Sequence, residues 1–105
     1  MRKLFSLTLA ASAVTACTQM TDYYPDAQTT DIAGRAFFVV ERPSLGPGVY
    51  LAGPNDPKMG EVLTGRDMTL PQANVAAIEA VTGCKVARET VRNQEATTYA
   101  AVTCQ

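Results

Sequence analysis

Apolar and polar positions divide this chain into an apolar start, a polar stretch at residues 18–33, and a patterned remainder that begins near Gly34. The first patterned segment, Arg35 to Glu41, is rich in aromatic and β-branched residues and is apolar on both faces. This pattern predicts a central strand that is covered on both sides. After a Pro- and Gly-rich loop, Val49 to Ala52 is expected to form an antiparallel second strand, and Glu61 to Thr64 a brief third strand.

A helix is predicted directly after Thr69. Thr69 and Gln72 fit a capping box, good helix formers follow, and Gly83 stands where a left-handed C-terminal cap is needed. The isolated polar residues Asn74 and Glu79 are expected to face solvent. The apolar stripe of this helix comprises Leu70, Ala73, Ala77, Ala80 and Val81, widened by Val75 and Ile78.

The end of the chain predicts a hairpin. Cys84 to Arg92 and Ala96 to Cys104 form its strands, with a loop at residues 93–95, and the pattern also tolerates a one-residue shift of that loop. Directly opposite residues in a non-hydrogen-bonded pair come close to the spacing that a disulfide needs. The expected opposite pairs are Cys84 with Cys104, Val86 with Val102, Arg88 with Ala100, and Thr90 with Thr98.

These elements predict a small α+β domain, with an antiparallel sheet of about four strands, one helix packed on one face, and the order β-β-α-β-β. A single helix leaves the other face of the sheet partly open. Phe37, Phe38 and Tyr99 are therefore a candidate partner surface, because exposed apolar area often marks such a site. Alternatively, the loops at 42–48 and 53–60 fold over this face.

The apolar start has the layout of an export signal. Arg2 and Lys3 precede an apolar run from Leu4 to Val14 of about 11 residues, whereas a transmembrane helix needs about 20. The small residues Thr15 and Ala16 close the segment. This three-part layout is typical of a removable signal rather than of a permanent membrane helix.

The stretch Val14-Thr15-Ala16-Cys17 resembles the lipobox of bacterial lipoproteins. The resemblance implies that residues 1–16 are removed, that the Cys17 thiol becomes thioether-linked to diacylglycerol, and that the new amino terminus is acylated, for example with palmitate. A thiolate is nucleophilic enough for this alkylation. Thr18 stands where lipoproteins of the inner membrane often carry Asp, so the resemblance favours an outer-membrane anchor facing the periplasm. The alternatives are an ordinary signal with a chance cysteine, or an uncleaved anchor.

The expected organisation is a signal peptide at 1–16, a lipid-anchored cysteine with a flexible tether at 17–33, and an α+β domain at 34–105. The tether is expected because residues 18–33 are polar and lack an apolar period. Tyr23 and Tyr24 are then either exposed on the spacer or in contact with the membrane interface, where tyrosine rings are favoured.

Charge and cysteine content narrow the class of protein. The chain has 9 basic and 10 acidic residues, and loss of the signal makes it more acidic, which argues against nucleic acid as a partner. With Cys17 on lipid, Cys84 and Cys104 form the even pair expected of a disulfide in an exported protein. Such a bridge closes a loop of about 20 residues and contributes about 3 kcal/mol. A redox-active pair is disfavoured because the Cys-x-x-Cys spacing is missing.

Catalysis is not expected. The chain has no histidine, which excludes Ser-His and Cys-His nucleophile pairs and most zinc sites, and no cofactor or metal is expected. Asp56, Glu61 and Asp67 are the densest carboxylate cluster, but they lie in turn-rich sequence. The sequence thus predicts a non-enzymatic cell-envelope lipoprotein with an accessory or protein-interaction role. The alternatives are a small periplasmic inhibitor or ligand-binding lipoprotein and, third, an enzyme that uses carboxylates.

Overall fold

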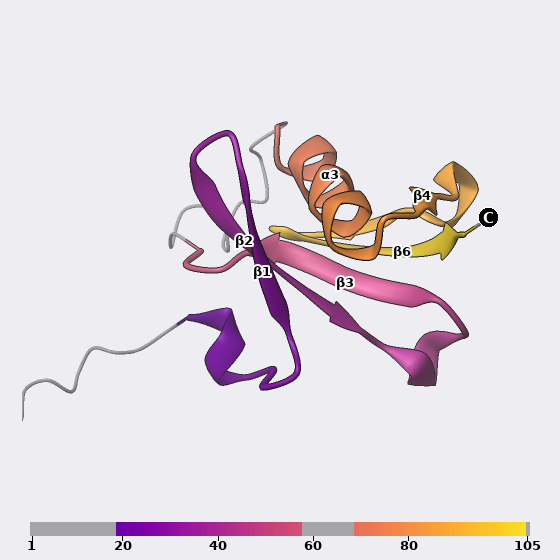
Figure 1. The fold of residues 1–105 in the computed structure, drawn as a ribbon, viewed down its shortest axis with the longest axis horizontal. Coiled ribbons are helices and arrows are strands. Elements are labelled where there is room, and N and C mark those ends of the chain that lie inside the picture. Colours follow the sequence, from indigo (N-terminus) through magenta and orange to yellow (C-terminus); the bar gives the residue numbers. More distant parts are fainter. Residues whose placement is uncertain (1–18, 58–68, 105) are drawn as a thin grey trace, which may run out of the picture.

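The structure, a computed structural model, describes residues 19–57 and 69–104. These residues form a six-stranded antiparallel sheet with one α-helix, α3, on one face (Figure 1). The sheet order is β1-β2-β3-β6-β4, and β5 also pairs with β6. The strands and the helix are β1 (Gln28–Ile32), β2 (Arg35–Glu41), β3 (Val49–Pro54), α3 (Leu70–Thr82), β4 (Lys85–Val86), β5 (Arg92–Gln94) and β6 (Thr97–Thr103). Three 3-10 turns are η2 (Met20–Asp22), η3 (Pro43–Leu45) and η4 (Arg88–Thr90).

The predicted α+β class with one helix on one face is confirmed, as are the strands at 35–41 and 49–52. The predicted count of about four strands and the order β-β-α-β-β are wrong, because β1 precedes the predicted first strand and η4 splits the partner of β6 into β4 and β5. The third strand predicted at 61–64 lies outside the described residues.

Strand β2 is the centre of the fold because both of its faces are buried. Phe37 and Val39 point toward α3, whereas Phe38 and Val40 point to the opposite face, which we call the underside. All four side chains are buried. The core under α3 is completed by Ala52, Leu70, Ala77, Ile78, Val86, Ala96 and Ala100.

Helix α3 has the predicted bounds, and only part of the predicted capping is observed. Gly83 adopts the left-handed conformation, with φ 72°, and its N–H donates to the Glu79 carbonyl at 2.9 Å. Thr69 has helical backbone angles, and its side chain does not form the N-capping hydrogen bond that the capping box predicted. Ala80, expected in the apolar stripe, is exposed.

The underside is covered by residues 19–27, which we call the N-terminal strap. Met20, Tyr24 and Ala27 pack against the buried cluster of Phe38, Val40 and Leu51. The Tyr24 ring stacks on Phe38, with centroids 5.6 Å apart and planes 8° from parallel. In Figure 1 the strap, in indigo, lies below the sheet while α3 lies above it.

The prediction of a flexible tether at 17–33 is therefore wrong from Gln19 onward. Residues 20–22 form a 3-10 turn, and residues 28–32 form strand β1, which pairs with β2 along its length. The polar composition that predicted a tether has a structural cause. Strand β1 is an edge strand whose side chains are mostly exposed, so it carries few apolar positions. The domain thus begins well before the predicted Gly34.

The C-terminal hairpin follows the predicted register only at its outer end. Val86 lies opposite Val102, as predicted. The chain then leaves the ladder and forms η4. The predicted register would place Arg92 opposite Ala96, but Arg92 lies opposite Tyr99. The loop predicted at 93–95 and the pairs Arg88–Ala100 and Thr90–Thr98 are therefore wrong. Instead of pairing, Thr90 accepts a hydrogen bond at its Oγ1 from the Ala101 N–H at 2.9 Å, which holds η4 against β6.

Asn74 is the largest departure from the predicted helix surface. It was expected in solvent, yet it is 1% exposed. Its Nδ2 donates to the Ala96 carbonyl and to Thr98 Oγ1, both at 3.0 Å, and Thr98 Oγ1 donates to Asn93 Oδ1 at 2.7 Å. Buried polar groups need such partners, because an unsatisfied one costs free energy. This network connects α3 to the β5–β6 hairpin.

We expect Tyr24→Ala to lower the free energy of unfolding by about 1–3 kcal/mol, because it removes the ring that covers Phe38. Tyr23→Ala is a matched control with the same atoms removed from an exposed neighbour, and it should change that energy by less than about 0.5 kcal/mol. Chemical denaturation of both variants measures the difference. Equal, small effects would mean that residues 19–27 do not cover the sheet.

Replacement of Asn74 by Ala should cost about 1–2 kcal/mol of unfolding free energy, because the Ala96 carbonyl and the Thr98 hydroxyl lose their donor, a loss partly offset by removal of the buried Asn74 Oδ1, which has no hydrogen-bond partner among the described residues. Gln72→Ala, at an exposed position of the same helix, should be close to neutral. Thermal unfolding compares the two. A neutral Asn74→Ala would contradict the buried network.

Candidate functional site

The predicted partner surface at Phe37, Phe38 and Tyr99 is largely absent. Phe37 is 2% exposed and Phe38 is 0% exposed. The prediction is wrong for both residues because each face of β2 has its own cover, α3 on one side and the N-terminal strap on the other. The apolar residues that pack on Phe38 do not come from the described parts of the two loops that the sequence offered as alternatives, and residues 58–60 of the second loop lie outside the described residues. Tyr99 alone is half-buried and reaches the surface.

The part of the underside beyond the strap remains open. Strand register places Val49 opposite Ala101 and Leu51 opposite Tyr99, so these side chains share that face. Beside them lies a shallow hollow of about 590 Å³, which we call the open groove. Its lining combines apolar and charged groups and consists of Leu45, Val49, Glu89, Thr90, Arg92, Tyr99, Ala100 and Ala101.

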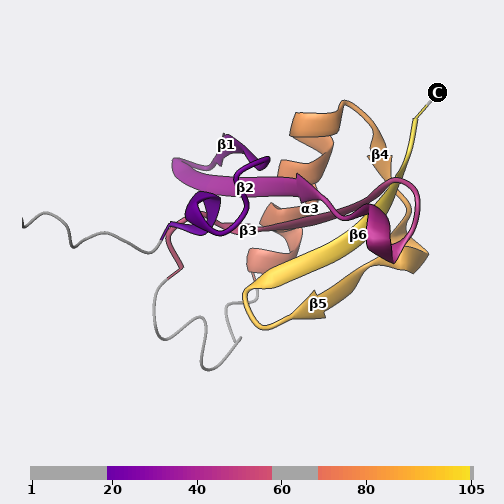
Figure 2. The same ribbon diagram turned by 90° about the horizontal axis from the view of Figure 1, so that it is seen from below.

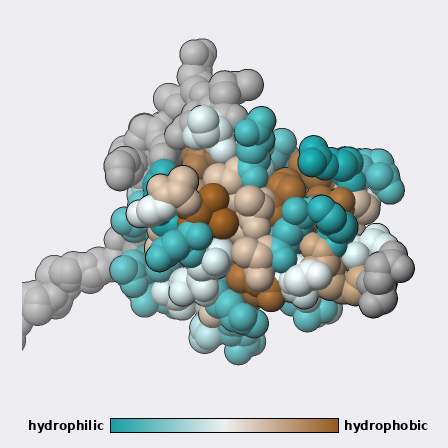
Figure 3. All heavy atoms as spheres, turned by 45° about the horizontal axis from the view of Figure 1, so that its top comes forward, coloured by the Kyte–Doolittle hydropathy of each residue, from teal (hydrophilic) through white to brown (hydrophobic). Residues whose placement is uncertain are grey.

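Large apolar side chains are exposed at two described positions. Tyr23, at the end of η2, is 69% exposed, and Leu45, in η3, is 55% exposed. Figure 2 shows η2 and η3 on the near side of the sheet when the molecule is seen from below. On the side that carries α3, apolar residues form small patches interrupted by hydrophilic ones (Figure 3). The sequence signal for Leu45 was an apolar residue placed among Pro and Gly in a loop.

Charged groups surround these exposed side chains. A second shallow hollow is lined by Tyr23, Asp26, Glu41 and Arg42, among others. The Arg42 guanidinium lies over the Tyr24 ring, with Cζ 5.5 Å from the ring centroid. An arginine in this position contributes a cation–π contact to the strap. The underside therefore carries both acidic and basic residues rather than a field of one sign.

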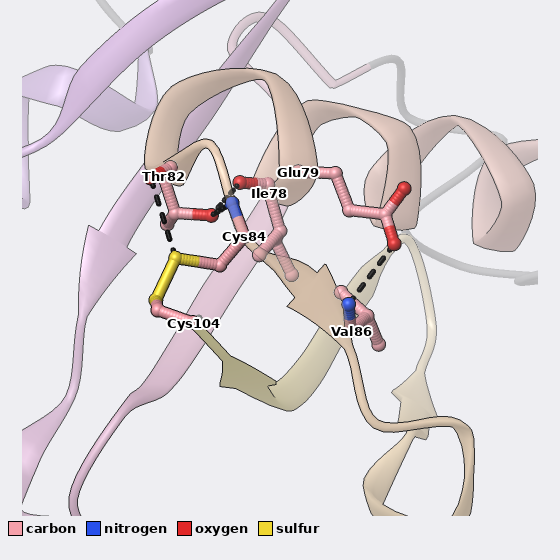
Figure 4. Close-up of a disulfide and its surroundings, with 6 residues drawn as sticks. All are labelled: Ile78, Glu79, Thr82, Cys84, Val86 and Cys104. Carbon is pink, nitrogen blue, oxygen red and sulfur yellow. Dashed lines mark hydrogen bonds between the residues drawn. A yellow bond between two sulfur atoms is a disulfide. The ribbon is translucent and has the colours of Figure 1, made fainter.

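The predicted disulfide between Cys84 and Cys104 is confirmed, with the two Cα atoms 4.7 Å apart. Figure 4 shows that it joins the end of α3 to the end of β6. The Cys84 N–H donates to Thr82 Oγ1 at 3.1 Å, which fixes the backbone just before the bridge. Glu79, expected in solvent, is half-buried and accepts the Val86 N–H at 2.9 Å, a further link from the helix to β4.

The described residues do not form a metal-binding cluster. Within 19–57 and 69–104, no group of three or more His, Cys, Asp or Glu side chains is placed to hold a metal ion. In the carboxylate cluster of the sequence prediction, Asp56 is exposed, and Glu61 and Asp67 lie outside the described residues. Cys17 lies outside them as well. No helix in the described part of the chain is long and apolar enough to cross a bilayer.

Comparison with known proteins adds no relative. No protein-family model, no curated protein and no solved structure matches this chain. The function is therefore inferred from the residues of this chain.

Loss of the disulfide should cost about 3 kcal/mol of unfolding free energy, because the bridge closes a loop with a sequence separation of 20 residues. The Cys84→Ser, Cys104→Ser double variant should match the reduced wild-type domain in a denaturant titration. Reductant should not affect the double variant, which is its control. A wild-type domain whose stability does not respond to reductant would contradict this assignment.

Proposed function

We propose that this chain is a lipoprotein of the bacterial cell envelope that is anchored through Cys17 and acts by protein contact or as a structural accessory, not by catalysis. The observation that carries the proposal is the lipobox-like stretch that ends in Cys17 after an export-type signal. A thiol must be free for alkylation, and the bridge between Cys84 and Cys104 leaves Cys17 as the remaining cysteine of the chain. Thr18 favours the outer membrane and an orientation toward the periplasm.

The second candidate function is a small periplasmic inhibitor or ligand-binding lipoprotein. The open groove favours it, because shallow surfaces that combine aromatic, aliphatic and arginine side chains are common at protein contacts. Tyr99 and Arg92 are neighbours across the β5–β6 ladder and both line this groove. Tyrosine and arginine are also the residue types that dominate binding energy in many interfaces.

The lipid anchor is tested by feeding cells an alkyne analogue of palmitate. The wild-type chain should become labelled, and Cys17→Ala should lose the label and leave the membrane fraction, because no other cysteine is free to carry diacylglycerol. The Cys84→Ser, Cys104→Ser double variant is the control and should keep its label. Undiminished labelling of Cys17→Ala would refute the anchor.

The two candidate activities are separated by capture from detergent-solubilised envelope, with Tyr99→Ala and Arg92→Ala as groove variants. A membrane- or wall-associated protein that is lost from both variants supports the accessory role. A soluble hydrolase that is lost from both supports the inhibitor role.

A further inference from the structure

The folded domain begins almost at the proposed anchor. The Met20 N–H donates to the Asn55 carbonyl at 2.7 Å, and the Thr21 N–H donates to Asn55 Oδ1 at 3.1 Å. Asn55 is buried, and its own N–H donates to the Ala36 carbonyl in β2 at 3.0 Å. The chain is therefore attached to the sheet from Met20 onward.

This attachment limits the distance between the domain and the bilayer. Two residues, Thr18 and Gln19, lie between Cys17 and Met20, and the three Cα–Cα steps from Cys17 to Met20 span at most roughly 11 Å. A flexible tether running to residue 33 would have permitted a far greater distance. Provided that Cys17 is lipidated as proposed, the domain remains at the headgroups, where a short link gives an effective concentration of about millimolar or more. Even a weak contact between the domain and the bilayer is then populated.

The face next to the anchor is the underside. The strap that follows Cys17 lies across it, and η3 projects from the same side (Figures 1 and 2). The two mostly exposed large apolar side chains of the described residues, Tyr23 and Leu45, belong to these two turns. Tyrosine rings are favoured at the membrane–water interface, and an aliphatic side chain enters the acyl boundary.

We propose that the underside of the sheet lies on the bilayer that holds the lipid anchor, with Tyr23 and Leu45 inserted at the headgroup level. Helix α3 lies on the opposite side and faces the periplasmic space.

The charges on this face define the lipid that it fits. Asp26 and Glu41 lie beside Arg42 in the hollow next to Tyr23, so the described residues of this face do not form the cluster of basic side chains that binds anionic lipid. Contact of the underside with the bilayer therefore arises from the interfacial side chains and from the short link to Cys17. Vesicles of zwitterionic phosphatidylcholine are the appropriate probe, and anionic lipid is not required.

Tryptophan scanning tests the orientation, because the chain has no tryptophan of its own. Tyr23→Trp and Leu45→Trp place a reporter on the underside, and Gln72→Trp places the matched control at an exposed position of α3. Each lipidated variant is reconstituted into phosphatidylcholine vesicles with brominated acyl chains. We expect the fluorescence at positions 23 and 45 to fall about twofold relative to unbrominated vesicles, and that at position 72 to change little.

The proposal is overturned if Leu45→Trp is quenched no more than Gln72→Trp. Blue-shifted emission at position 45 that depends on protein concentration and is not quenched by bromine would also overturn it, because a second copy would then cover this face. A Gly-Ser insertion between Thr18 and Gln19 should reduce the quenching at position 45, since a longer link lowers the effective concentration. Unchanged quenching would show that the short link between Cys17 and Met20 does not hold the underside on the bilayer.

Failure of the anchor and failure of the orientation give different results. The intact mass of protein extracted from cells shows whether Cys17 carries lipid. Independently, coupling the Cys17 thiol of residues 17–105 to a maleimide phospholipid places an anchor at the same position, and the three tryptophan variants can then be compared again. Absence of natural lipid with quenching at position 45 in the coupled protein would refute the anchor alone.

Discussion

Strand β2 carries large apolar side chains on both of its faces, and the rest of the fold is arranged to bury them. Phe37 and Val39 require a cover on one side, and Phe38 and Val40 require another on the opposite side. The described residues supply one α-helix, and the second cover is made from residues 19–27, which precede the sheet. Burial of a phenylalanine contributes about 1.5–3 kcal/mol, which is a large share of the stability of a small domain. The strap is therefore part of the core and not an appendage.

The two covers are attached by different means. The strap is held by ring stacking between Tyr24 and Phe38 and by backbone bonds to Asn55. Helix α3 is held by apolar packing, by the Asn74 network and by the Cys84–Cys104 bridge. The covalent link therefore lies on the helix side, whereas the strap side depends on ring stacking and on hydrogen bonds to the buried Asn55.

The sequence predicted those elements whose signals are local or periodic. Strand β2 was evident from its aromatic and β-branched run, α3 from its helix formers and terminal Gly83, and the disulfide from the opposition of Cys84 and Cys104. Edge strand β1 and the strap were missed, because an exposed strand and a segment with few apolar anchors have the composition of a linker. The buried state of Asn74 was missed for a related reason, since its partners come from a hairpin distant in sequence.

The same limit applies to the candidate surface. Sequence reasoning correctly required a second apolar face but assigned Phe37 and Phe38 to it, because the covering segment was assumed to be flexible. Leu45 and Tyr99 are among the residues that do reach the surface of the underside. Leu45 lies in a turn, and Tyr99 lies at a sheet position whose exposure depends on how far the strap extends. The local pattern places Leu45 in a Pro- and Gly-rich loop, but how far the strap covers the face around Tyr99 depends on contacts between segments distant in sequence.

The bond between Met20 and Asn55 also has an evolutionary consequence. In many anchored proteins a long spacer tolerates insertions and deletions freely, because none of its backbone groups is engaged. Here an insertion within residues 20–27 would shift Tyr24 away from Phe38 and uncover the sheet. With the proposed anchor at Cys17, the height of the domain above the membrane can change through residues added ahead of Gln19, whereas Met20, Tyr24 and Ala27 are constrained by their packing against the sheet.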